Sequence, residues 1–152
     1  MNNRERMNGP EYSISKPAPG IVLARLSGPG VMALGSAPLR ELTRQVEKSE
    51  RVELFIDASG LHGSSVEASD AWALWFSRHR TRLKQVNLLP GSGSLHVSQE
   101  FLRRFADTSG VLRIYLDRAA YDAAYSTAVL QARRRVIAIL DWMGGPQRNA
   151  RA

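Results

Sequence analysis

The residues with the clearest chemical potential directly follow an apolar run, Val52–Ile56. Asp57 ends that run, Ser59 and Gly60 follow, and His62 comes soon after. An Asp at a strand end can stabilise a turn through its carboxylate, act as an acid, accept a phosphoryl group or bind a metal ion. A serine becomes a nucleophile only with a base in reach, and nothing in the sequence orients His62. The pattern favours turn stabilisation by Asp57, and leaves a hydrolase that uses Ser59 and His62 as a minor alternative.

A second group of hydroxyls precedes a helix predicted over residues 66–83. Ser64 or Ser65 can cap this helix, and capping is the commoner role of serine at such a position. The spacing does not match the Gly-x-Ser-x-Gly nucleophile elbow. A phosphate is electrostatically favoured at a helix N-terminus, so an exposed serine here is also a candidate for phosphorylation.

No other stretch predicts a metal, cofactor or catalytic site. The three histidines, His62, His79 and His96, do not pair at metal-ligand spacing. The Gly-rich loop at 90–94 lacks the lysine and Ser/Thr of a Walker motif. There are no cysteines, which excludes disulfides and thiolate chemistry. We therefore expect no metal, no cofactor and no catalysis.

Composition indicates one ordinary globular domain. The chain has 152 residues, of which 43% are hydrophobic and 23% charged. No apolar run reaches the roughly 20 residues of a membrane span, and no secretory signal is visible at the start, so a bacterial-type cytoplasmic protein is the expectation. The net charge is +7, with the excess mainly in the last helix and tail, so nucleic-acid binding is not expected.

Hydrophobic periodicity predicts an α/β fold. Strands are predicted at 12–15, 21–26, 52–56, 85–89 and 111–116, and helices at 37–48, 66–83, after Ser98 and from 118 to 143. Ser36 is expected to cap the first helix, and Asp117 the last. This order predicts a mixed, mostly parallel sheet of about five strands with an antiparallel first edge and helices packed on it. Residues 1–10 are expected to form a flexible leader, and Gly144–Pro146 to end the last helix before a disordered tail, 144–152.

The helix predicted over 66–83 has an aromatic face. Trp72, Trp75 and Phe76 lie on it with His79, which we interpret as a residue at the boundary of the core. Two Trp residues in one turn are not expected to point fully inward together, so one of them should face a groove or a partner. A site for a small apolar ligand at these three rings is the alternative to simple core packing.

The last helix is unusually long and carries Arg133, Arg134 and Arg135 beside Val136, Ile137, Ile139, Leu140 and Trp142. A basic amphipathic segment of this kind suits a partner groove or a membrane surface. Packing across its own domain is an equal alternative, and a homodimer also remains open.

The order of elements and the stretch Asp57-Ala58-Ser59-Gly60 together resemble a STAS domain, the fold of anti-sigma-factor antagonists and SpoIIAA-like proteins. In that family a strand ends in Asp-Leu-Ser-Gly, and Asp-Ser-Ser-Gly then opens a helix, with its second Ser as the phosphorylation switch. Those four positions fall on 65–68 here, so Glu67 occupies the phospho-acceptor position. A shift of one or two residues would bring Ser64 or Ser65 into that role.

The resemblance covers residues 11–126 and implies a small non-enzymatic module, with residues 127–143 as a helical extension. The module would dock on an anti-sigma-type kinase or another regulator through a surface at Asp57, Ser59, Ser64, Ser65 and Glu67. The departure at Glu67 implies that the phosphorylation switch is absent or replaced by a permanent negative charge. Some SpoIIAA-like relatives imply an alternative, the binding of a lipid or other small apolar ligand, here near Trp72 and Trp75.

Overall fold

The computed structural model describes residues 11–28, 35–62, 66–91 and 110–149, and within these ranges leaves out the side chains of 66–69 and 145–149. Several predictions lie outside these residues: the leader at 1–10, the serines Ser64 and Ser65, most of the loop at 90–94 and the helix after Ser98.

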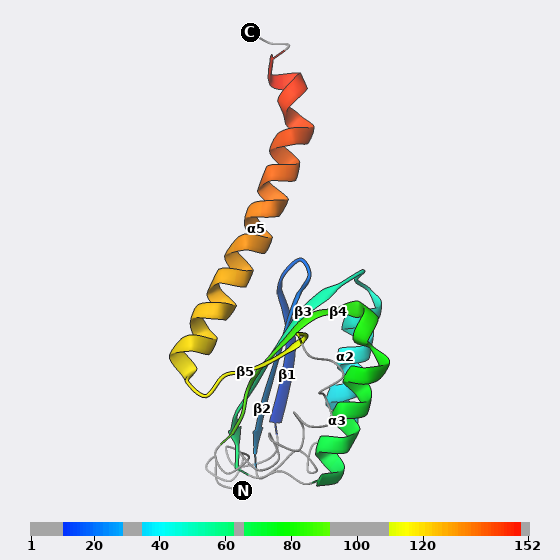
Figure 1. Ribbon diagram of the computed structural model, residues 1–152. Helices are drawn as coiled ribbons and strands as arrows, with labels where there is room; N and C mark the ends of the chain where they lie inside the picture. Colours follow the sequence, from blue (N-terminus) through cyan, green and yellow to red (C-terminus); the bar gives the residue numbers. More distant parts are fainter. Residues whose placement is uncertain (1–10, 29–34, 63–65, 92–109, 150–152) are drawn as a thin grey trace, which may run out of the picture.

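A five-stranded mixed sheet forms the centre of the molecule (Figure 1). Its strands are β1 (Glu11–Ala18), β2 (Ile21–Gly28), β3 (Val52–Leu61), β4 (Leu83–Leu89) and β5 (Leu112–Ile114), and they lie in sequence order across the sheet. The first pair is antiparallel and every later pair is parallel. The predicted α/β class, the strand count and the antiparallel edge are therefore confirmed.

Helices cover both faces of the sheet. Helices α2 (Ala37–Glu47) and α3 (Val66–Arg78) pack on one face, and α5 (Arg118–Asn149) lies on the other (Figure 1). Alternate residues of the buried strands serve the two faces, as the two-residue repeat of a strand requires. Leu54 and Ile56 of β3 join the core under α2 and α3, whereas Phe55 joins the core under α5.

Two boundaries differ from the sequence prediction around the aromatic helix. The strand β3 continues to Leu61 because Ser27 and Gly28 of β2 pair with Gly60 and Leu61, so Asp57, Ser59 and Gly60 lie in a strand and not in a loop. Helix α3 ends at Arg78 and a short 3-10 turn, Arg80–Arg82, follows it. Leu83 then starts β4, where it is buried opposite Val52, and does not extend the helix.

The predicted helix caps have mixed outcomes. The Asp117 carboxylate accepts a hydrogen bond of 2.9 Å from the Ala119 N–H, which confirms the cap of α5. Ser36 makes no side-chain cap bond, so that prediction is wrong, although Pro38 does lie in the first turn of α2. Helix α5 continues through Gly144–Pro146 to Asn149, so the predicted stop is also wrong. Each glycine disfavours a helix by about 1 kcal/mol without preventing it.

Candidate functional site

The carboxyl ends of the parallel strands lie together at one end of the sheet, which we call the carboxyl edge. We call the opposite end, where these strands begin, the amino edge. At the carboxyl edge β2 ends at Gly28 and β3 at Leu61, and α5 begins at Arg118, four residues after β5 ends at Ile114. Open α/β sheets bind their ligands and partners at this edge, because the loops that follow the strands converge there. Asp57, Ser59 and His62, which the sequence analysis singled out, lie at the same edge.

Asp57 is held by a tight polar cluster. Its Oδ1 accepts hydrogen bonds from the Ser59 N–H, at 3.1 Å, and from the Ser59 hydroxyl. Its Oδ2 accepts a hydrogen bond of 2.9 Å from Nη2 of Arg118, and the same nitrogen lies 2.6 Å from Ser59 Oγ. The bond from the Ser59 N–H is the Asx-type contact expected of an Asp in this position. The cluster joins β3 to the first residue of α5.

The charge of Asp57 is stabilised by this cluster. Burial alone raises the pKa of the Asp57 carboxyl, but hydrogen bonds from Ser59 and Arg118 outweigh it, and the pKa falls below its ordinary value of 3.8. Reciprocally, the hydrogen bond to Asp57 raises the pKa of the Arg118 guanidinium. Asp57 is therefore a fixed carboxylate with its oxygens occupied, a state that suits an anchor and not a general acid.

Gly60 has a packing role at the same edge. A Cβ added there would lie 2.8 Å from the Ser27 Cβ and 3.2 Å from the Leu26 carbonyl oxygen. The register of β2 and β3 shifts between Arg25 and Ser27, and this shift brings the two backbones close. A side chain larger than hydrogen would push the strands apart.

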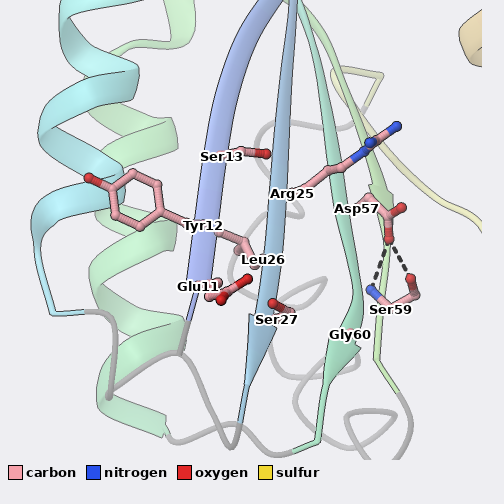
Figure 2. A pocket seen from close by; sticks show the side chains of 9 residues that line it. All are labelled: Glu11, Tyr12, Ser13, Arg25, Leu26, Ser27, Asp57, Ser59 and Gly60. Atoms are coloured by element: carbon pink, nitrogen blue, oxygen red, sulfur yellow. Dashed lines mark hydrogen bonds between the residues drawn. The ribbon is translucent and has the colours of Figure 1, made fainter. Parts of the chain in front are cut away.

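A groove of about 350 Å³ is lined by residues of β1, β2 and β3, among them Asp57 and Ser59 of the cluster (Figure 2). Arg25 lies between Ser13 and Asp57 in the strand register, and in the described part of the chain it forms no ion pair. Figure 2 shows Arg25 and Asp57 on the same side of the sheet, whereas Tyr12 points toward the helices of the other side. The lining is completed by Glu11, Leu26, Ser27, Ser59 and Gly60.

Tyr121 is buried near this cluster and is 3% exposed. Its hydroxyl has no hydrogen-bond partner among the described residues. Burial, reinforced by the negative charge of Asp57, raises the pKa of the Tyr121 phenol. The ring packs edge-on against Phe55 and Tyr115, which fixes the start of α5 against the sheet.

Arg25, Arg118 and Tyr121 are the site residues that the sequence analysis missed. Arg118 could have been found from topology, because the helix after β5 must begin at the carboxyl edge where Asp57 lies. Arg25 lies between the buried residues Ala24 and Leu26, so the strand repeat indicates that its side chain is on the opposite face of the sheet. The sequence does not reveal which residues lie beside it there.

The structure brings some of the predicted site residues together and leaves others apart. Ser59 Oγ contacts Asp57 and Arg118, whereas His62 is exposed and its N–H bonds the Gly28 carbonyl. Glu67 lies in the first turn of α3, just past the end of β3. Within the described ranges, no three His, Asp or Glu side chains are grouped as a metal site would require.

The aromatic residues of α3 pack in the core. Trp72, Trp75 and Phe76 are all buried, so the prediction that one Trp faces outward is wrong. The rings can share the interior because Trp75 donates its Nε1–H to Thr43 Oγ1 of α2 at 2.9 Å, which satisfies its polar atom. His79 stacks on Trp75 and bonds its carbonyl through Nδ1 at 2.8 Å, as expected of a residue at the boundary of the core.

Helix α5 packs on the sheet through its first half only. Tyr121, Ala128, Val129 and Ala132 are buried, whereas Ile137, Ile139, Leu140, Trp142 and Met143 are more than half exposed. Figure 1 shows the later half of α5, in orange and red, projecting past the end of the sheet. For the basic segment that begins at Arg133, the alternative of packing across its own domain is therefore wrong, because its apolar side chains are exposed. None of the helices in the described ranges has the length and apolarity that crossing a membrane requires.

Comparison with known proteins gives no assignment. No protein-family model matches the chain, and no curated protein matches it either.

Proposed function

We propose that the chain is a non-catalytic regulatory module that resembles a STAS domain and docks on another protein through the carboxyl edge of its sheet. The docking surface comprises the end of β3, the segment that contains Ser64 and Ser65, and the start of α3 at Glu67. The partner class implied by the resemblance is an anti-sigma-type kinase or another regulator. In this proposal Glu67 supplies a permanent negative charge at the phospho-acceptor position.

The observation that carries the proposal is the state of the Asp57 cluster. The Asp57 carboxylate is bonded by Ser59 and Arg118, and the Ser59 hydroxyl is bonded within the same cluster. A nucleophile needs a free base and a general acid needs a proton at working pH, and this cluster supplies neither. A rigid edge built in this way suits recognition, because a preorganised surface loses little entropy on binding.

The fold supports the same proposal at a coarser level. The two-stranded antiparallel start, the alternating parallel strands and helices, and the Asp-x-Ser-Gly stretch at the end of β3 all agree with the resemblance. Helix α3 begins five residues after β3 ends, so Glu67 belongs to the segment that follows the carboxyl end of β3. For the alternative, a lipid-like ligand at the α3 aromatics, the described contacts of Trp72 and Trp75 offer no support beyond core packing.

The experiment is quantitative affinity capture from the source cells with three forms of the chain. The wild type is compared with Glu67→Arg, which reverses charge at the proposed surface. The matched control is Glu47→Arg, which makes the same change at an exposed position near the opposite edge. We expect a protein that the wild type and the control retain and that Glu67→Arg loses.

Equal capture by all three forms, or capture of no protein by any of them, contradicts the proposal. Esterase or phosphatase turnover that disappears in Ser59→Ala would contradict its non-catalytic part.

A further inference from the structure

The stripe of α5 that packs on the sheet continues past the sheet. The inward positions Tyr125, Val129 and Ala132 are followed at the same alternating spacing of four and three residues by Val136, Ile139 and Met143. This spacing keeps all six on one side of the helix and is the repeat by which helices pair. We call Val136, Ile139 and Met143 the overhang stripe, because the sheet covers the first three positions and leaves the last three exposed.

The overhang stripe borders a groove at the amino edge of the sheet. This groove has a volume of about 260 Å³ and lies between α5 and the strand starts. Its apolar lining includes Ile21, Ala132, Val136 and Ile139. Stripe and groove form one continuous apolar track, on the opposite edge of the sheet from the Asp57 cluster.

The charges beside this track are mainly positive. Arg51, Lys84 and Arg135 line the groove, and none of them forms an ion pair in the described ranges. The acidic residue of the lining, Glu53, accepts a hydrogen bond from Asn87. An occupant that matches the track therefore has apolar side chains flanked by carboxylates.

The shape of the surroundings selects a narrow occupant. The overhang stripe faces the side of α5 on which the sheet lies, and α2 and α3 extend the domain further on that side (Figure 1). A flat membrane would meet the domain before it reached the stripe, whereas a single helix can lie along it. A second copy of α5 would bring another cluster of arginines, Arg133, Arg134 and Arg135, against the positive charges already present.

We propose that the α5 overhang and the groove beside it bind an acidic amphipathic helix of a partner protein. The helix would lay its apolar face along Val136, Ile139 and Met143 and direct its carboxylates to Arg51, Lys84 and Arg135. This surface is separate from the carboxyl-edge surface of the proposed function, and the module would thus hold two partners at opposite edges of its sheet.

The probes are two designed three-heptad helical peptides with Leu and Ile at their core positions. One carries Glu at every flanking position and the other Lys, and each bears a fluorophore for anisotropy titration against the full chain. We expect the Glu peptide to bind at least about tenfold more tightly than the Lys peptide, with a preference that weakens as salt rises.

Three variants separate the contributions. Ile139→Ser/Met143→Ser removes exposed apolar side chains, leaves the core intact and should lower Glu-peptide affinity by about tenfold or more. Arg51→Glu/Arg135→Glu should reverse the preference toward the Lys peptide. Arg40→Glu/Arg80→Glu makes the same charge change at exposed positions that do not line the groove and should leave the preference unchanged.

Equal binding of both peptides, or binding of neither, overturns the proposal. It is also overturned if sedimentation shows that the wild type dimerises and Ile139→Ser/Met143→Ser does not, because a second copy then occupies the stripe. The proposal is overturned in favour of a lipid surface if the wild type binds vesicles rich in phosphatidylserine and Ile139→Ser/Met143→Ser does not.

Discussion

Arg118, the first residue of α5, lies 2.9 Å from Asp57 of β3 across 61 positions of sequence. The contact is side chain to side chain, and the Asp57 side chain is 13% exposed. This contact fixes the start of α5 at the carboxyl edge. It also occupies the carboxylate of Asp57, which has the clearest chemical potential in the sequence. The same residues therefore explain why the helix starts there and why the edge is rigid.

Asp57→Asn tests this anchor. The amide keeps the size of the side chain but removes the negative charge that accepts bonds from Ser59 and Arg118, so we expect the free energy of unfolding to fall by about 1 kcal/mol. Urea denaturation followed by far-ultraviolet circular dichroism measures the change. The control is Glu47→Gln, at an exposed position, and it should change the free energy of unfolding little. An equal decrease in both variants would contradict the anchoring role of Asp57.

The contribution of Asp57 should depend on pH in a defined direction. Because its pKa in the folded chain is below the ordinary 3.8, the stabilisation is complete above that value and is lost as pH falls through the folded pKa. The difference in unfolding free energy between wild type and Asp57→Asn should thus be constant near neutral pH and shrink below about pH 4. Urea titrations at pH 7 and pH 3 measure it, and a difference that grows on acidification would refute the assigned charge state.

Gly60→Ala should destabilise the chain by about 1–3 kcal/mol, because the new Cβ meets Ser27 and the Leu26 carbonyl. Gly144→Ala is the matched control, since a Cβ there has nothing within 4 Å and lies in a helix. The control should leave stability unchanged or raise it by up to about 1 kcal/mol. Thermal unfolding of both variants measures the contrast, and similar midpoints would show that the close approach of β2 and β3 is not required.

Tyr121, which is buried, and Tyr115, which is partly buried, should respond differently to loss of their hydroxyls. Tyr121→Phe removes an oxygen without a partner in the described ranges and should be neutral or stabilising by up to about 1 kcal/mol. Tyr115→Phe removes a hydrogen bond of 3.0 Å to Asn87 Oδ1 and should destabilise by about 1 kcal/mol. Denaturant titration measures the free energy of unfolding of the two variants. A large decrease in Tyr121→Phe would mean that the Tyr121 hydroxyl is hydrogen-bonded in solution.

The sequence predicted the fold class well because its signals are local. Runs such as Val52–Ile56 report burial directly, and alternating strands and helices limit the topology. The end of β3 was mispredicted because its pairing with Ser27 and Gly28 is a long-range contact with no local signal. The inward packing of both Trp72 and Trp75 likewise depends on Thr43, which lies on another helix.

The candidate site was predicted only in part for the same reason. Asp57, Ser59 and Gly60 stood out because their types and spacing are visible within four residues. Arg118 and Arg25 did not, because each becomes a site residue only once the sheet places it beside Asp57. The Asx-type bond from the Ser59 N–H to Asp57 was expected from the sequence, but the contact with Arg118 that anchors α5 was not.

The most direct test of the docking proposal is photo-crosslinking in the source cells. In one variant, a photoreactive phenylalanine analogue replaces the residue at position 67, at the start of α3. In a separate control variant, it replaces the residue at the exposed position 77, near the other end of the same helix. The proposal predicts that position 67 crosslinks to one discrete protein partner and that position 77 does not. Equal crosslinking from both positions, or none from position 67 in a folded chain, would contradict it.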